Sequence, residues 1–215
     1  PEGGVEPHIH NYLLPIAPKS KKKGGAGILH EMKDGPIRNL SYRAGVRSIS
    51  TDDDVIGNIR QFIQLKLQAF IQYCVIIAQY EDKKSITEQH AIESLKLNDI
   101  VLLGDEIVSK KTALDDAPAK NNKEELRNIN KYQKTTDLLL PTTLFKKICG
   151  EVLKDFSVDI TVFSEKAYYI IQHAIEYEVV KLFMNAQVCA MHASREEINS
   201  ADVLLSRFND KSAVP

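Results

Sequence analysis

The feature that most constrains the fold is a long helical stripe of apolar side chains, which occurs twice. In residues 55–84 the stripe has the three- and four-residue steps of one helix face, at Ile56, Ile59, Ile63, Leu67, Phe70, Cys74 and Ile77. In residues 165–193 it recurs at Ile171, Ile175, Val179, Leu182, Ala186 and Ala190. A helix of about 28 residues is roughly 40 Å long, so it needs a partner of similar length. Each long helix can supply that partner to the other.

Shorter helical segments flank both long helices. Residues 37–43 and 88–97 flank the first, and residues 141–156 and 200–208 flank the second. The acidic residues 52–54, together with Thr87 and Ser164, stand where helix N-termini favour negative charge or a capping side chain. The order short, long, short therefore appears twice and indicates an internal duplication. We predict an all-α protein in which long helix crosses long helix and neither half is stable alone.

The composition predicts where these units begin and end. Residues 1–34 contain Gly, Pro and the run KSKKKGGAG and are predicted to form a flexible N-terminal tail. Two helical units follow at 35–97 and 123–208, joined by a linker at 98–122, and a C-terminal tail is expected at 209–215.

Charge, cysteines and motifs limit the classes of function. The formal net charge of −1 provides no overall attraction to nucleic acid, so polyanions would need local basic patches. Three widely spaced cysteines favour a reducing intracellular compartment over a disulfide framework. No apolar run of about 18 residues predicts a membrane span, and the first residues lack the order of a signal peptide. The patterns GxxxxGK[ST], HExxH and GxSxG are absent, so we expect neither an enzyme nor a cofactor.

Several segments resemble core histones. The segments similar to histone three, including its extra N-terminal helix, are LRNINKYQKTTDLLL (126–140), VLKDFSVDI (152–160), QHAIEYEVVKLF (172–183) and CAMHASR (189–195). The segments similar to histone four are PIRNLSYRAGVRSIS (36–50) and KKSITEQHAIESLK (83–96). A histone-four-like half fused ahead of a histone-three-like half resembles the histone doublets of marseillevirus-like giant DNA viruses.

The resemblance implies two histone folds in one chain that form an intramolecular handshake heterodimer. It implies a core histone doublet that wraps and compacts double-stranded DNA in a nucleosome-like particle. The expected partners are DNA, a second copy of the chain, and a second doublet or pair of the other two core-histone types. The expected location is the virion and the viral factory or host nucleus. Fusion also makes pairing of the halves intramolecular, at a high effective concentration.

The resemblance also implies a set of DNA-contacting residues. Histones bind phosphates where first and second loops lie side by side and where first helices begin. The matching positions are Arg38, Arg43, Arg47, Ser48, Lys83, Lys84, Ser85, Arg127, Lys134, Lys147, Thr161 and Arg195. Taken singly, each cation has the alternative of being an ordinary solvated side chain.

Some positions depart from the family pattern. Ser48 and Thr161 stand where the family has a groove-inserting arginine, and Gly150 stands where it has a phosphate-binding arginine. Glu196 and Glu197 would repel phosphate from the second loop. Because each lost phosphate contact lowers the salt dependence of binding, we expect weaker wrapping than in a eukaryotic particle.

The pair Cys189 and His192 has three interpretations: a dimer interface, a locally satisfied core histidine, or a metal or redox site. A metal needs three or four ligands, and the sequence has no second CxxH or HxxxH, so no metal is expected. The resemblance implies a four-helix bundle with a second copy, built around Cys189, His192, Arg195, Asp202 and Leu205. In it, His192 would donate to the partner's carboxylate and Arg195 would pair with Asp202.

A second class of function stays open. Histone-fold scaffold subunits of transcription complexes, such as TATA-protein-associated or CCAAT-binding subunits, use the fold mainly to dimerise. The near-neutral charge suits a scaffold. The segment YQKTTDLL and the His–Arg–Asp set favour a nucleosomal histone three instead.

Overall fold

The computed structural model describes residues 31–51, 54–98, 100 and 124–209, and these residues form two helical units. The elements of the first unit are α2 (Asp34–Arg43), β1 (Ser48–Ile49), α3 (Val55–Tyr80), β2 (Ser85–Ile86) and α4 (Glu88–Leu97). The elements of the second unit are α5 (Glu124–Gln133), α6 (Thr142–Phe156), β3 (Val162–Phe163), α7 (Glu165–His192), β4 (Glu197–Ile198) and α8 (Ser200–Asn209). The predicted all-α class is confirmed, with two-residue strands in the loops.

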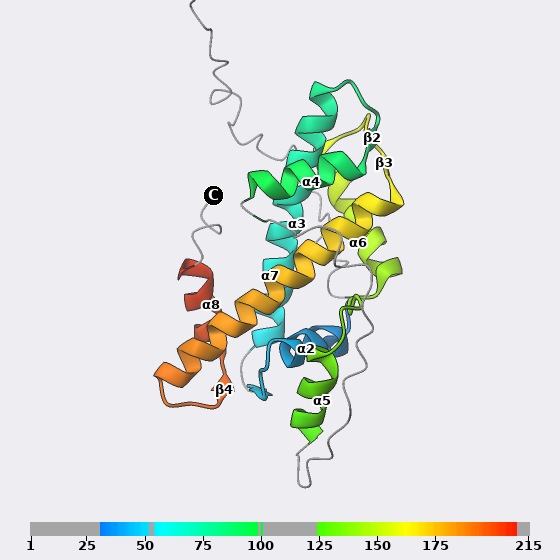
Figure 1. The fold of residues 1–215 in the computed structure, drawn as a ribbon. Helices are drawn as coiled ribbons and strands as arrows, with labels where there is room; N and C mark the ends of the chain where they lie inside the picture. Colours follow the sequence, from blue (N-terminus) through cyan, green and yellow to red (C-terminus); the bar gives the residue numbers. More distant parts are fainter. Residues whose placement is uncertain (1–30, 52–53, 99, 101–123, 210–215) are drawn as a thin grey trace, which may run out of the picture.

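The long helices of the two units cross each other. In Figure 1, α7 in yellow and orange passes over α3 in cyan, and the two helices are in contact. α6 packs on α3, α4 packs on α7, and α8 packs on both long helices, so each unit covers the apolar face of the other. The core is continuous across the crossing and contains the fully buried rings of Phe70, Phe145 and Phe183.

The helix N-termini form where the capping side chains predict them. Asp54 caps α3 by accepting a hydrogen bond of 2.9 Å from the Gly57 amide. Thr87 caps α4 in a reciprocal capping box with His90, and Ser164 caps α7. These side chains satisfy backbone amides that have no partner inside the helix, which fixes the first residue of each helix.

Short backbone bridges join the loops of the two units at opposite ends of the crossed helices. β1 pairs with β4 in parallel, with Ser48 opposite Glu197, and β2 pairs with β3 in parallel, with Ser85 opposite Val162. The loop between α7 and α8 therefore contains one side of a bridge, the two-residue strand β4. The bridges place a first loop of one unit beside a second loop of the other, twice.

The predicted boundary of the N-terminal tail is wrong at residues 31–34. Met32 is fully buried, Arg60 donates to its carbonyl oxygen at 2.7 Å, and α2 already begins at Asp34. Met32 and the buried Ile37 occupy the two positions of a hydrophobic staple, in which an apolar residue before a helix packs on its first turn. The predicted linker also begins too early, at residue 98, because Ile100 is still buried and its amide donates to the Leu95 carbonyl. The rest of both predicted tails and of the linker lies outside the described residues.

α3 has the length and hydropathy of a membrane-crossing helix, although the sequence predicted none. Half of its most apolar 18-residue window is buried inside the protein. Its contacts with α4, α6 and α7 account for that apolar character as core packing.

Candidate nucleic-acid interface

The bridge between β2 and β3 presents an exposed loop in which two lysines follow two acidic residues, Glu81 and Asp82. Lys83 and Lys84 precede β2 and are exposed, and Thr161 is exposed directly before β3. The turn is held by the Lys83 amide, which donates to the Ala78 carbonyl at 2.8 Å, and by Asp82 in the left-handed conformation (φ 55°). Ser85, half-buried, continues into the bridge. This end offers cations and backbone amides to a phosphate.

The bridge between β1 and β4 has mixed charge. Arg47 and Ser48 are exposed. On the other side of the bridge, Glu197 in β4 and Glu196 directly before β4 are exposed as well. The Ser48 hydroxyl donates to the Glu197 carboxylate at 3.5 Å. A phosphate at this end would meet one exposed arginine beside two carboxylates, so its loops expose fewer cations than the loops of the β2–β3 end.

The first helices α2 and α6 lie between these ends, and the cations near them are partly engaged. Lys147 on α6 forms an ion pair with Glu31 at 3.1 Å, while Arg38 on α2 is half-buried. Gly150 lies inside α6, and a Cβ atom placed there would meet nothing within 4 Å. Arg127 on α5 and Lys134 directly after α5 are exposed.

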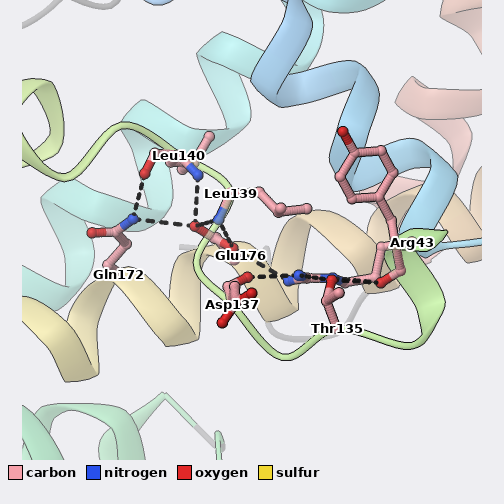
Figure 2. A network of polar contacts seen from close by, with 8 residues as sticks. Arg43, Thr135, Asp137, Leu139, Leu140, Gln172 and Glu176 are labelled. Atoms are coloured by element: carbon pink, nitrogen blue, oxygen red, sulfur yellow. Dashed lines mark hydrogen bonds and ion pairs between the residues drawn. The ribbon is translucent and has the colours of Figure 1, made fainter. Parts of the chain in front are cut away.

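Arg43 has a different position from the one predicted for a phosphate ligand. Its side chain is only 18% exposed and reaches from α2 into the segment between α5 and α6 (Figure 2). Its guanidinium donates to the carbonyl oxygens of Tyr132 at 3.4 Å and Asp137 at 2.6 Å, and it pairs with Glu176 at 3.4 Å. Arg43 therefore fastens the two units together in this structure, and its contact with phosphate stays a prediction.

Glu176 is the centre of this network. Its carboxylate accepts from the amides of Leu139 and Leu140 at 2.8–2.9 Å and from the Gln172 side chain at 3.2 Å. Burial raises the pKa of Glu176, and these donors and Arg43 oppose that rise. Burial likewise lowers the pKa of Arg43, against the effect of Glu176 and Asp137. The network holds the segment after α5 against α7.

The end of α7 and the helix α8 carry the residues predicted to meet a second copy. Arg195 holds Asp202 through two hydrogen bonds of 2.8 Å, and the Asn199 amide donates to the same carboxylate at 2.9 Å. His192 is exposed, and the Cys189 thiol lies 3.7 Å from the Ser206 hydroxyl. Because Arg195 already pairs with the Asp202 carboxylate, its guanidinium is less available to bind a phosphate.

The end of α7 and the helix α8 also carry large apolar side chains that are at least 40% exposed, named here the uncovered apolar surface: Met184, Val188, Met191, Leu204, Leu205 and Phe208. Where such side chains are contiguous, they mark a protein contact. Within the described residues no group of three His, Cys, Asp or Glu side chains could hold a metal ion.

Sequence reasoning missed one pair of charges in the core. Lys66 on α3 and Glu178 on α7 are both buried, and their charged atoms lie 3.0 Å apart. A signal for both was present, because each stands three residues after a member of its apolar stripe, Ile63 and Ile175 respectively. A charge in register with a buried stripe indicates a buried partner.

One family comparison bears on this arrangement. Residues 121–207 match the family model described as the core histone domain, which is shared by histones two-A, two-B, three and four. The match covers α5, α6, α7 and most of α8, which is less than half of the 215 residues. The second unit is therefore histone-like, with an all-α histone fold. That family consists of structural DNA-binding proteins of chromatin, not enzymes.

Proposed function

We propose that this chain is a core histone doublet that wraps double-stranded DNA in a nucleosome-like particle. The observation that carries the proposal is the pair of parallel bridges at opposite ends of the crossed helices. Each bridge places loops of both units side by side, and the first helices α2 and α6 belong to the region between them. In this reading the crossed packing of α3 and α7 is the handshake of two histone partners.

The charges support uneven and weak DNA contact. The end at β2 and β3 exposes two lysines, Lys83 and Lys84, after Glu81 and Asp82, whereas the end at β1 and β4 exposes a single arginine, Arg47, beside Glu196 and Glu197. Between them, Lys147 is already paired. DNA is proposed to be held more firmly at the β2–β3 end and to leave first from the β1–β4 end, because carboxylates repel phosphates.

The proposed assembly uses the uncovered apolar surface on α7 and α8. Two copies would meet there, with His192 of each chain donating to Asp202 of the other. The core would then recruit a second doublet or pair of the other two core-histone types. On the strength of the resemblance, we propose that the protein acts in a virion, viral factory or host nucleus.

Reconstitution on DNA tests the proposal. The purified chain is mixed with random-sequence DNA, with and without candidate histones, and digested with nuclease. Protected fragments of uniform length support wrapping, whereas no protection and no shift in electrophoresis contradict it. Loss of binding at a salt concentration equal to that of a eukaryotic nucleosome would contradict the weak-wrapping part alone.

Charge reversal tests the asymmetry. The logarithm of affinity falls with the logarithm of salt concentration by about 0.9 per neutralised phosphate. Replacing Lys83 and Lys84 by Glu should reduce that slope by about 1–2, and replacing Glu196 and Glu197 by Lys should increase it. Equal and small effects at both ends would refute the asymmetry.

The alternative is a histone-fold scaffold in a transcription complex. Such a scaffold would bind random DNA weakly or only with its partner, so the same electrophoretic experiment separates the two. The near-neutral charge is what favours this alternative.

A further inference from the structure

Two opposite charges are buried where the two units meet. Lys66 on α3 is 9% exposed and Glu178 on α7 is 2% exposed, and Nζ lies 3.0 Å from Oε2. Both positions are in register with the buried stripe of their helix, where apolar residues are the norm. The Lys66 ammonium also lies 5.6 Å from the centre of the Phe62 ring.

Another charge near this pair lies on the rim. Lys181, one turn further along α7 and 42% exposed, has its ammonium 4.0 Å from the second oxygen of Glu178. Glu178 thus has a buried cation from the opposite unit and a rim cation from its own helix. The buried cation is the one that depends on pairing of the units.

A buried ion pair contributes little net stability, because the desolvation of two charges offsets their attraction. Two apolar residues of similar volume at the same positions are often equally stable or more stable. Removal of one partner is different, since it leaves a buried charge without compensation, and that is strongly destabilising. The pair therefore matters less for how strongly the units associate than for which units can associate.

We propose that Lys66 and Glu178 determine the pairing specificity of the two units. The first unit accepts a long helix that brings a carboxylate to the depth of Lys66, which its own second unit does. A histone-fold helix with an apolar or basic residue at that depth does not supply the carboxylate that Glu178 supplies, so that crossing loses the buried ion pair and is disfavoured. In a cell containing other histone-fold proteins, this selects pairing with the chain's own kind, whether or not the protein wraps DNA.

Thermal unfolding of full-length variants tests the first half of the inference. Lys66→Glu and Glu178→Lys each place like charges together and should lower Tm by about 6–20 °C. The reversed pair, Lys66→Glu with Glu178→Lys, should recover at least half of that loss. Lys66→Met with Glu178→Met should melt at or above the wild-type temperature. Lys154→Glu, the same charge change on an exposed lysine, is the control and should shift Tm by about 2 °C or less.

Exchange between chains tests specificity itself. Full-length Lys66→Glu and Glu178→Lys chains with different affinity tags are denatured, mixed and refolded together. Within either variant chain, residues 66 and 178 carry the same charge. When the first unit of one variant pairs with the second unit of the other, residues 66 and 178 carry opposite charges, and this holds for both such combinations. We expect tagged mixed pairs with Tm restored towards the wild-type value, even if neither chain folds alone.

Two controls separate this exchange from ordinary dimerisation of intact chains. Lys66→Glu refolded with wild-type protein should show no recovery of its own transition, and differently tagged wild-type chains measure the background of mixed pairs. Absence of rescue in the complementary mixture, or equal rescue in the wild-type mixture, would overturn the inference. So would full stability of both single variants. None of these results depends on DNA.

Discussion

Replacing Arg43 by Ala separates a structural role from a DNA-binding role. The guanidinium donates at 2.6 Å to the Asp137 carbonyl oxygen and pairs with the buried Glu176 at 3.4 Å. A hydrogen bond from a charged donor contributes about 1.5–3 kcal/mol, and breaking a buried ion pair costs about 3–5 kcal/mol. Since Arg43 keeps some exposure and Glu176 keeps other donors, we expect a loss of about 3 kcal/mol in the free energy of unfolding.

The assay is unfolding without DNA. For a protein of this size, about 3 kcal/mol corresponds to a fall in Tm of about 6–12 °C. Faster amide hydrogen exchange at Leu139 and Leu140 should accompany it, because their amides donate to the carboxylate that Arg43 helps to hold. Arg47→Ala is the matched control, since Arg47 is an exposed arginine four residues further along. It should leave Tm within about 2 °C and, under the proposed function, lower the salt slope of DNA binding by about 0.9.

The opposite pattern would refute this reasoning. If Arg43→Ala kept the wild-type Tm and exchange rates but reduced the salt slope of DNA binding, Arg43 would be a phosphate ligand. The contacts in Figure 2 would then contribute nothing measurable to the fold.

Three further predictions follow from single positions. Gly150→Arg should raise stability by about 0.5–1 kcal/mol, because glycine is a poor helix former and its Cβ position is open, and it should steepen the salt slope of DNA binding; unchanged affinity would contradict the second part. Arg195 and the Asn199 amide hold the pKa of Asp202 below its ordinary value of 3.8, although burial acts against them. That stabilisation is present above the ordinary pKa and is lost as the pH falls through the lowered pKa, so Asp202→Asn should unfold earlier than wild type at pH 7 and converge with it in acid. Cys189 should be the thiol that Ellman's reagent labels in the native protein, because Cys74 is buried and burial raises its pKa to about 12; rapid labelling of all three cysteines would contradict this.

The helices and their caps could be predicted because their causes are local. Periodic apolar residues, the capping residues Asp54, Thr87 and Ser164, and the length of the two long helices are all properties of short segments. The length argument also predicted that each long helix would need the other, and the two are in contact. Lys83 and Lys84 are exposed, and their contact with DNA stays a prediction.

The roles of individual charged side chains were decided by tertiary structure. Arg43 and Lys83 are both cations of the first unit that were predicted to contact DNA, and no local pattern separates them. Arg43 is directed into the protein because Tyr132 and Asp137 provide carbonyl oxygens and the more distant Glu176 provides a carboxylate, whereas Lys83 is exposed to solvent. Lys66 shows the same dependence, since the Glu178 carboxylate that pairs with it in the core comes from the other unit.

The sequence by itself determined the helices, their order, and the need for two long helices to cover each other, since apolar periodicity and capping act within a few residues. Only the tertiary structure decided which charges are directed inward and which remain available to a ligand. The physical reason is that the cost of burying a charge depends on partners that chain folding brings together from distant positions.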